Sequence, residues 1–427
     1  MTWLLILGLF VFFALNVPFA FAMLLTSIIY LLVIGDVPLV VVAQRVAVGT
    51  DAYLLLAIPF FFLAAELMNS GGIMERLVRL AQALVGHVRG GLGHVNVLSS
   101  MLFAGISGSA VADVAGLGRL EIDMMRRGGY DRDVAAALTA ASATIGPIIP
   151  PSIPLVLYGG IAEVSVGRLF LGGVVPGLLM AAFLMAAVYR IARRRDYPKE
   201  ARVPTADLVR AVGRSIPILV LPFIILGGIL SGAFTPTEAS VVAAAYALAV
   251  GALLLREIRW PSLGPILVKV GVDTARLMFI IASASLFGWI LAREGVPQAL
   301  AAGFLAVSQE PWAVLLMINV LLLLLGCFME PLTVMVILVP IFLPLIQQLG
   351  IDPVHFGLIV TLNLMIGLIT PPVGMVMFVI IGLTNISIER FARAVLPLLG
   401  ALVLVLLLVT YVPSVVLFLP DLIMGPS

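Results

Sequence analysis

Residues 144–154 read Thr-Ile-Gly-Pro-Ile-Ile-Pro-Pro-Ser-Ile-Pro and interrupt a long apolar stretch with four prolines. Residues 366–374, Ile-Gly-Leu-Ile-Thr-Pro-Pro-Val-Gly, interrupt a second apolar stretch in the same way. A proline has no amide donor and leaves an earlier carbonyl unpaired, which is costly in lipid unless protein or an ion satisfies it. The fold therefore depends on two helices that are broken at membrane depth.

The chain as a whole is far more apolar than a soluble domain. Of its 427 residues 62% are hydrophobic and 11% are charged, and the mean hydropathy is +1.22. Soluble domains are about half apolar and about a quarter charged. Because one helical crossing needs about 20 apolar residues, the sequence predicts an all-α polytopic membrane protein with about 11 transmembrane helices and two re-entrant hairpins.

The two interrupted stretches belong to an internal repeat. An offset of 221 residues pairs these positions: Gly105 with Gly326, Gly129 with Gly350, Asp131 with Asp352, Gly146 with Gly367, Pro150-Pro151 with Pro371-Pro372, and Pro176 with Pro397. Glycine and proline determine backbone shape, so their coincidence indicates that the two halves share one design.

Basic residues predict that the two halves are inverted in the membrane. Short cytoplasmic loops collect Lys and Arg, and 21 of the 24 basic residues lie in five segments: 70–94, 119–132, 190–214, 256–276 and 384–393. The six basic residues from Arg190 to Arg202 correspond to 411–423, which hold none. Equivalent loops therefore face opposite sides, and we expect a multi-pass protein of the bacterial inner membrane with a periplasmic C-terminus.

This orientation of the loops divides the chain into four regions. We expect N-terminal scaffold helices at 1–52, a first inverted repeat at 53–204 with a hairpin at about 91–118, connecting scaffold helices at 205–273, and a second inverted repeat at 274–427 with a hairpin at about 311–346. Inverted repeats of this kind place a substrate site near the midplane, between discontinuous helices. The apolar stretch 3–35 is expected to be retained in the membrane and to break near Asn16.

The hairpins and the broken helices contain polar side chains within otherwise apolar segments. In the first, glycines permit sharp turns, Ser107 and Ser109 supply hydroxyl oxygens, and Asp113 supplies a carboxylate. In the second half, Glu330 corresponds to Ser109 and Asn363 to Ser142. Freed carbonyls and serine hydroxyls are hard oxygen ligands that suit sodium, and polar groups inside apolar runs usually face a cavity.

Two further segments have local interpretations. Thr235-Pro-Thr-Glu-Ala239 is typical of a helix start, so Glu238 is either a capping residue or a member of the site. Residues 74–89 alternate charged and apolar side chains and predict an amphipathic helix on the inner surface.

Together these stretches resemble the large membrane subunit of TRAP (tripartite ATP-independent periplasmic) transporters across nearly the whole chain. The matching motifs are Val17-Pro-Phe-Ala-Phe-Ala22, Gly105-Ile-Ser-Gly-Ser109, Gly146-Pro-Ile-Ile-Pro-Pro151, Thr235-Pro-Thr-Glu-Ala239 and Gly367-Leu-Ile-Thr-Pro-Pro372. The resemblance implies an elevator transporter in which sodium drives the uptake of an organic acid. It also implies a periplasmic substrate-binding protein and a small membrane subunit, here expected as a separate chain.

The resemblance also implies particular site residues. The sodium ligands carried over by motif are Ser107, Ser109, Gly146, Ile149 and Pro151 at one site, and Gly326, Gly367, Thr370 and Pro372 at the other. Asp113, Glu330 and Asn363 are expected to line the cavity for a carboxylate substrate.

Two other functions remain open at this point. One is a stand-alone, ion-coupled organic-anion carrier without a binding protein. The other is an intramembrane enzyme that uses Asp113 and Glu330 as acid and base, although no catalytic His or Cys lies near them in the sequence. We expect no enzymatic activity, no cofactor other than sodium as the coupling ion, and no nucleic-acid partner. The absence of a Gly-rich phosphate-binding loop fits an ion-driven mechanism.

Overall fold

The structure is a computed structural model that describes residues 2–15, 17–69 and 72–426, and these residues form helices and turns without any strand. The all-α class is therefore confirmed. Asn16, where we expect the first apolar stretch to break, lies outside the described residues. The helices α1 (Thr2–Ala14) and α2 (Phe19–Ile34) are separate on either side of it.

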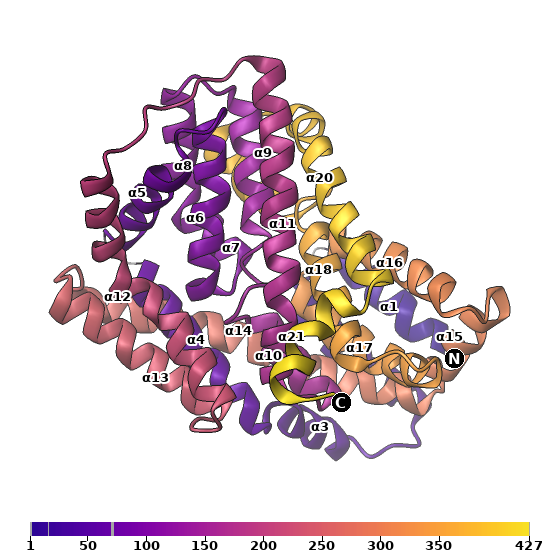
Figure 1. The fold of residues 1–427 in the computed structure, drawn as a ribbon. Helices are drawn as coiled ribbons and strands as arrows, with labels where there is room; N and C mark the ends of the chain where they lie inside the picture. Colours follow the sequence, from indigo (N-terminus) through magenta and orange to yellow (C-terminus); the bar gives the residue numbers. More distant parts are fainter. Residues whose placement is uncertain (1, 16, 70–71, 427) are drawn as a thin grey trace.

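The remaining elements are helices of very different length (Figure 1). The first half contains α3 (Val40–Thr50), η1 (Tyr53–Leu56), α4 (Ala57–Asn69), α5 (Ile73–Val85), α6 (Gly91–Ser107), α7 (Ala110–Gly116), α8 (Gly118–Arg127), α9 (Arg132–Ala143), α10 (Ile153–Ala162) and α11 (Val166–Arg195). The second half contains α12 (Thr205–Leu230), α13 (Pro236–Ala249), η2 (Val250–Leu254), α14 (Trp260–Arg293), α15 (Val296–Val307), α16 (Pro311–Phe328), α17 (Pro331–Gln348), α18 (Pro353–Gly367), α19 (Met375–Thr384), α20 (Ile388–Tyr411) and α21 (Ser414–Met424).

Among the described residues, seven helices are long and apolar enough to cross a membrane, or up to nine if each of two bent pairs counts as one span. The bent pair α6–α7 turns by 120° at its break. The predicted number of about 11 crossings stays a prediction, because several broken spans consist of shorter helices.

The helix boundaries recur at the offset found in the sequence. Helix α6 ends at Ser107 and α16 ends at Phe328, while α7 begins at Ala110 and α17 begins at Pro331. Each half then continues with a helix that ends before a Pro-Pro pair, and both Pro-Pro peptide bonds are cis. Equivalent elements therefore follow one another in the same order in the two halves.

The contacts between helices suggest two groups. In the first, α6 and α9 pack on each other, α11 packs on α6, α18 and α20, α20 packs on α9 and α18, and α16 packs on α18. Helix α14 packs on α2, α3 and α4, while α13 packs on α4 and α12. Helix α5 contacts both α6 and α12, and α14 contacts α17. The broken helices thus lie in one group, next to a second group built around α14.

Two segments show where long helices start and stop. Helices α20 and α21 are separate because Pro413 lacks the amide that would continue the helix. Helix α14 starts at Trp260, so most of the basic segment 256–276 is helical. This extension brings charged side chains of α14 close to the two broken helix pairs.

Candidate substrate and cation site

The break in the first hairpin packs directly on the proline-rich segment. Gly108 joins α6 to α7 in the left-handed conformation, with φ of 60°. A Cβ atom on Gly108 would lie 2.7 Å from the carbonyl oxygen of Pro151, which is too close for a real side chain. Only glycine therefore allows Ser107 and Ser109, on either side of it, to approach residues 147–152.

Asp113 lies buried behind this break. Its Oδ1 atom accepts a hydrogen bond from the Ser107 hydroxyl, and its Oδ2 atom has no hydrogen-bond partner among the described residues. A Cβ atom on Gly146 would lie 2.4 Å from Oδ2, so the carboxylate rests on the backbone of the broken helix. A buried carboxylate oxygen without a partner is costly, and a small cation that takes oxygen ligands would satisfy it.

The other residues expected at the first cation site would contribute through the backbone. The Ile149 side chain packs against Gly177 of α11, so only its carbonyl is available to a cation. The Ser152 hydroxyl donates to the carbonyl of Pro147 and also caps α10 by accepting from Leu155 N at 3.2 Å. The segment 144–152 is thus held in place by its own polar groups.

The residues expected at the second cation site meet at a contact between two glycines. A Cβ atom on Gly367 would lie 2.6 Å from the carbonyl carbon of Gly326, so the backbones of α16 and α18 touch there. Thr370 Oγ1 donates to the carbonyl of Ile366 at 2.7 Å, which leaves its lone pairs free. Pro372 is exposed nearby in the chain. The structure therefore brings Gly326 and Gly367 together and leaves the Thr370 oxygen able to act as a ligand.

A cavity of about 490 Å³ lies between the two broken pairs and α14. Its size is in the range of small-molecule sites. Its polar lining residues are Glu66, Ser107, Ser109, Lys269, Asp273, Arg276 and Glu330. Lys269 Nζ pairs with Glu66 Oε2 at 2.6 Å, and Arg276 Nη1 lies 3.6 Å from Asp273 Oδ1. The Arg276 side chain is 75% exposed, so a carboxylate entering the cavity can reach it.

Comparison with known proteins settles the family. Residues 6–415 match the family described as the tripartite ATP-independent periplasmic transporter, DctM component. The chain is 44% identical over 410 residues to the sialic acid TRAP transporter large permease protein SiaM of Vibrio cholerae, covering 96% of each chain. It is 45% identical over 372 residues to the C4-dicarboxylate TRAP transporter large permease protein DctM of Pseudomonas aeruginosa, covering 87% of each. This chain belongs to the TRAP transporter large permease family.

The resemblance seen in the motifs is thereby confirmed, and this TRAP permease is a multi-pass membrane protein. It also matches the sialic acid TRAP transporter permease protein SiaT of Haemophilus influenzae, 42% identical over 380 residues, but covers 62% of that longer protein. The structure of the YdaH transporter of Alcanivorax borkumensis is similar in fold, with a TM-score of 0.63 and 15% identity over 90% of this chain and 89% of that one.

Of the three residues expected to line the substrate cavity of the TRAP permease, the structure places Glu330 in the lining. Asp113 is not among the lining residues, but it is hydrogen-bonded to Ser107, which is. Asn363 is fully buried, where its Nδ2 atom donates to the carbonyl oxygen and the side-chain oxygen of Asn319, at 3.0 and 2.7 Å. Asn363 therefore holds α18 against α16.

The sequence motifs did not single out Lys269, Arg276 and Glu121. The first two lie seven residues apart on α14, a spacing that places them on one helix face and could have pointed to them. Glu121 of α8 is buried and accepts hydrogen bonds from Asn96 Nδ2 at 2.7 Å and from Ser99 Oγ at 2.5 Å. No local pattern distinguishes it from the charged residues around it.

Glu238 of the TRAP permease has a capping role. Thr235 N donates to Glu238 Oε2 at 2.8 Å, and Glu238 N donates to Thr235 Oγ1 at 3.3 Å, which forms a reciprocal capping box at the start of α13. Neither residue is among those that line the cavity. Capping accounts for the motif without a direct role in the site.

Proposed function

We propose that this chain is the membrane pathway of a sodium-coupled uptake system for an organic acid. The observation that carries the proposal is the unpartnered Asp113 Oδ2 atom, buried beside Ser107 and Gly146 at the wall of the cavity. A sodium ion at this point would neutralise the carboxylate and gain hydroxyl and backbone oxygens as ligands. A sodium ion bound there would remove negative charge beside the cavity, which favours the entry of an anion.

The cavity can hold a carboxylate substrate once cations are bound. Lys269 and Arg276 supply positive charge from α14, but Glu66, Asp273 and Glu330 leave one negative charge in excess, which bound sodium would offset. Ser109 and the capped end of α17 supply hydrogen-bonding groups from the two broken pairs. Sialic acid and C4-dicarboxylates, which name the similar permeases, are organic acids of this class. We take a substrate of that class as the cargo.

The proposed movement is an elevator motion of the group that contains both broken pairs. That group, with α6, α9, α11, α18 and α20, would slide against the group around α14 and carry the ions and the substrate together. The two-group packing supports this division. A periplasmic binding protein would deliver the substrate to the outer face, and a small membrane subunit would complete the scaffold.

Uptake into proteoliposomes tests the proposal. The chain is reconstituted with its small subunit, and uptake of radiolabelled sialic acid and succinate is measured with an inward sodium gradient and the cognate binding protein, without ATP. We expect accumulation that collapses when sodium is replaced by potassium. Full-rate uptake without the binding protein would support the stand-alone carrier, and chemical conversion of the internal product would support the enzyme.

A further inference from the structure

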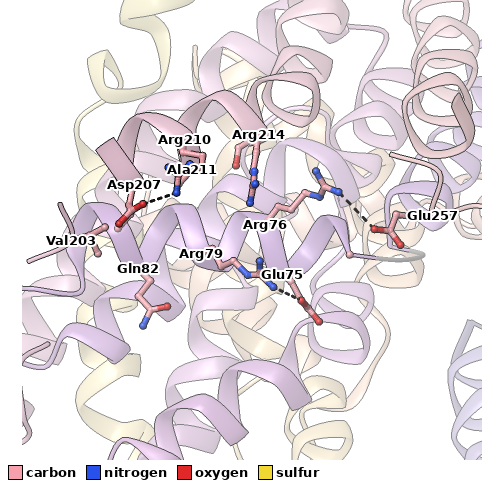
Figure 2. Close-up of a pocket in the computed structure, with 13 residues that line it drawn as sticks. Glu75, Arg76, Arg79, Gln82, Val203, Asp207, Arg210, Ala211, Arg214 and Glu257 are labelled. Carbon is pink, nitrogen blue, oxygen red and sulfur yellow. Dashed lines mark hydrogen bonds and ion pairs between the residues drawn. The ribbon is translucent and has the colours of Figure 1, made fainter. Parts of the chain in front are cut away.

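A second cavity, of about 670 Å³, lies between α5 and the start of α12, away from the broken pairs (Figure 2). Four arginines line it, two from each helix: Arg76, Arg79, Arg210 and Arg214. Figure 2 shows Arg214 directed from α12 toward the side of α5 that carries Arg76 and Arg79. Three carboxylates also line the cavity, Glu75, Asp207 and Glu257, so one positive charge is in excess.

The ion pairs within the cavity are open to solvent. Arg79 pairs with Glu75 at 3.0 Å, Arg210 with Asp207 at 2.8 Å, and Arg76 with Glu257 at 3.7 Å. Exposed pairs of this kind contribute little to stability. An anion that offers several oxygens at once can therefore reorganise them at small cost.

Two groups in the cavity have no partner among the described residues. Arg214 makes no hydrogen bond or ion pair with any of them. The next residue, Ser215, lines the cavity and is fully buried, and its Oγ atom has no hydrogen-bond partner among them. A free guanidinium beside a free buried hydroxyl provides donors for an anion, because guanidinium groups bind phosphate oxygens in pairs.

The surroundings favour a phosphate group attached to a lipid. Helix α12 changes at this point from a polar start to an apolar span. On the side of α12 turned away from Arg210 and Arg214, Val209, Val212, Ile216 and Phe223 are exposed, with Phe223 at 73%, as expected where a helix enters the membrane. Both helices begin in basic segments that we expect in the cytoplasm, where the membrane surface is anionic and basic pockets between helices bind lipid headgroups.

We propose that this cavity binds the phosphate-bearing headgroup of an anionic phospholipid of the inner leaflet. Arg79 and Arg214 grip the phosphate from the two helices, and the Ser215 hydroxyl donates to one of its oxygens. Helix α5 immediately precedes the hairpin α6–α7. A bound lipid therefore holds α5 against α12 and limits how far this end of the hairpin can move. This role is independent of sodium and of the transported acid.

The test uses the full chain, purified in a neutral detergent and stripped of lipid. Dioleoyl phosphatidylglycerol is titrated while bound lipid is counted by native mass spectrometry and the unfolding temperature is recorded. We expect phosphatidylglycerol to bind and to stabilise the protein more than phosphatidylcholine does. The double variant Arg79→Gln/Arg214→Gln should bind it about 10- to 100-fold more weakly, as expected when two basic residues are lost from a site at an anionic membrane surface.

The control variant Arg127→Gln/Arg393→Gln removes the same charge from exposed arginines outside this cavity and should bind as the original chain does. If the double variant is poorly folded, Ser215→Ala tests the same cavity, because it removes one hydroxyl and leaves the charges intact. Equal phosphatidylglycerol affinity in the original chain and in these cavity variants would overturn the proposal. Displacement of the lipid by equimolar inorganic phosphate would show a site for free phosphate instead.

Discussion

Ser109 and Glu330 occupy the same position in the two halves of the chain, and each caps the second helix of a broken pair. The Ser109 hydroxyl accepts from Ala112 N at 3.4 Å, and Glu330 Oε2 accepts from Thr333 N at 2.9 Å. Both residues line the same cavity. The repeat therefore preserves the cap but places a hydroxyl on one side of the cavity and a carboxylate on the other, which makes a symmetric scaffold chemically asymmetric.

This asymmetry predicts a role for Glu330 in coupling. Glu330→Gln keeps an oxygen acceptor for the cap but removes a negative charge that opposes an anionic substrate until a cation is bound. We expect the variant to fold. The ratio of its substrate affinities with and without sodium should be about tenfold smaller than in the original chain, which corresponds to about 1.4 kcal/mol. Calorimetric titration with and without sodium measures this. Glu310→Gln, at an exposed position before α16, should keep the original sodium dependence.

Gly146 should be as important as any side chain of the first cation site. Gly146→Ala places a methyl group 2.4 Å from Asp113 Oδ2, so the carboxylate must move away from the segment 144–152. Overpacking of this kind costs about 1–3 kcal/mol, and we expect apparent sodium affinity to fall at least about tenfold. In Gly400→Ala the new methyl group has nothing within 4 Å, and sodium-dependent uptake should be unchanged. A normal sodium response in Gly146→Ala would separate Asp113 from the ion site.

The parts of this architecture that sequence predicts are those fixed by local chemistry. Glycine at 108 permits a turn that other residues disfavour, and proline at 150, 151, 371 and 372 restricts the backbone wherever it occurs, so the breaks could be found without a structure. The capping motif at Thr235 and the amphipathic pattern of α5 are local in the same sense.

The parts that sequence does not predict depend on contacts between distant segments. Asn363 resembles a cavity residue until Asn319, 44 residues away, is seen to accept its hydrogen bonds. Arg276 resembles an ordinary cytoplasmic charge until α14 brings it to the hairpins. Glu121 differs from neighbouring surface charges only because Asn96 and Ser99 bury it.

Arg276 should help to retain the carboxylate of the substrate. Arg276→Gln leaves the helix intact and removes the most exposed cation of the cavity. We expect a rise in the apparent Michaelis constant for the organic acid of about three- to tenfold, with a smaller effect at high ionic strength, where exposed charges are screened. Initial uptake rates at several substrate and salt concentrations measure this. Arg393→Gln, exposed and outside the cavity, serves as the control, and equal behaviour of the two variants would place substrate recognition elsewhere.

The capping box at the start of α13 predicts a change in stability without a change in transport chemistry. Thr235→Ala removes a hydroxyl that accepts from Glu238 N, and loss of such a cap costs about 0.5–2 kcal/mol. The unfolding temperature of the purified protein should fall, whereas the sodium dependence of uptake by the folded fraction should stay the same. A shift in sodium affinity would instead give this motif a part in the ion pathway.

The proposed sodium sites include three side-chain hydroxyl groups. Ser107→Ala removes an oxygen beside Asp113, Ser109→Gly removes one while costing the cap only a few tenths of a kcal/mol, and Thr370→Val tests the second site with little change of shape. Because a hydrogen-bonding partner of a charged group contributes about 1.5–3 kcal/mol, apparent sodium affinity should fall by about 10- to 100-fold in each variant. Ser283→Ala is the matched control, since that buried hydroxyl only donates to its own helix at Phe279. Unchanged sodium dependence of uptake in all three variants would mean that the broken pairs serve helix packing only and that sodium binds elsewhere.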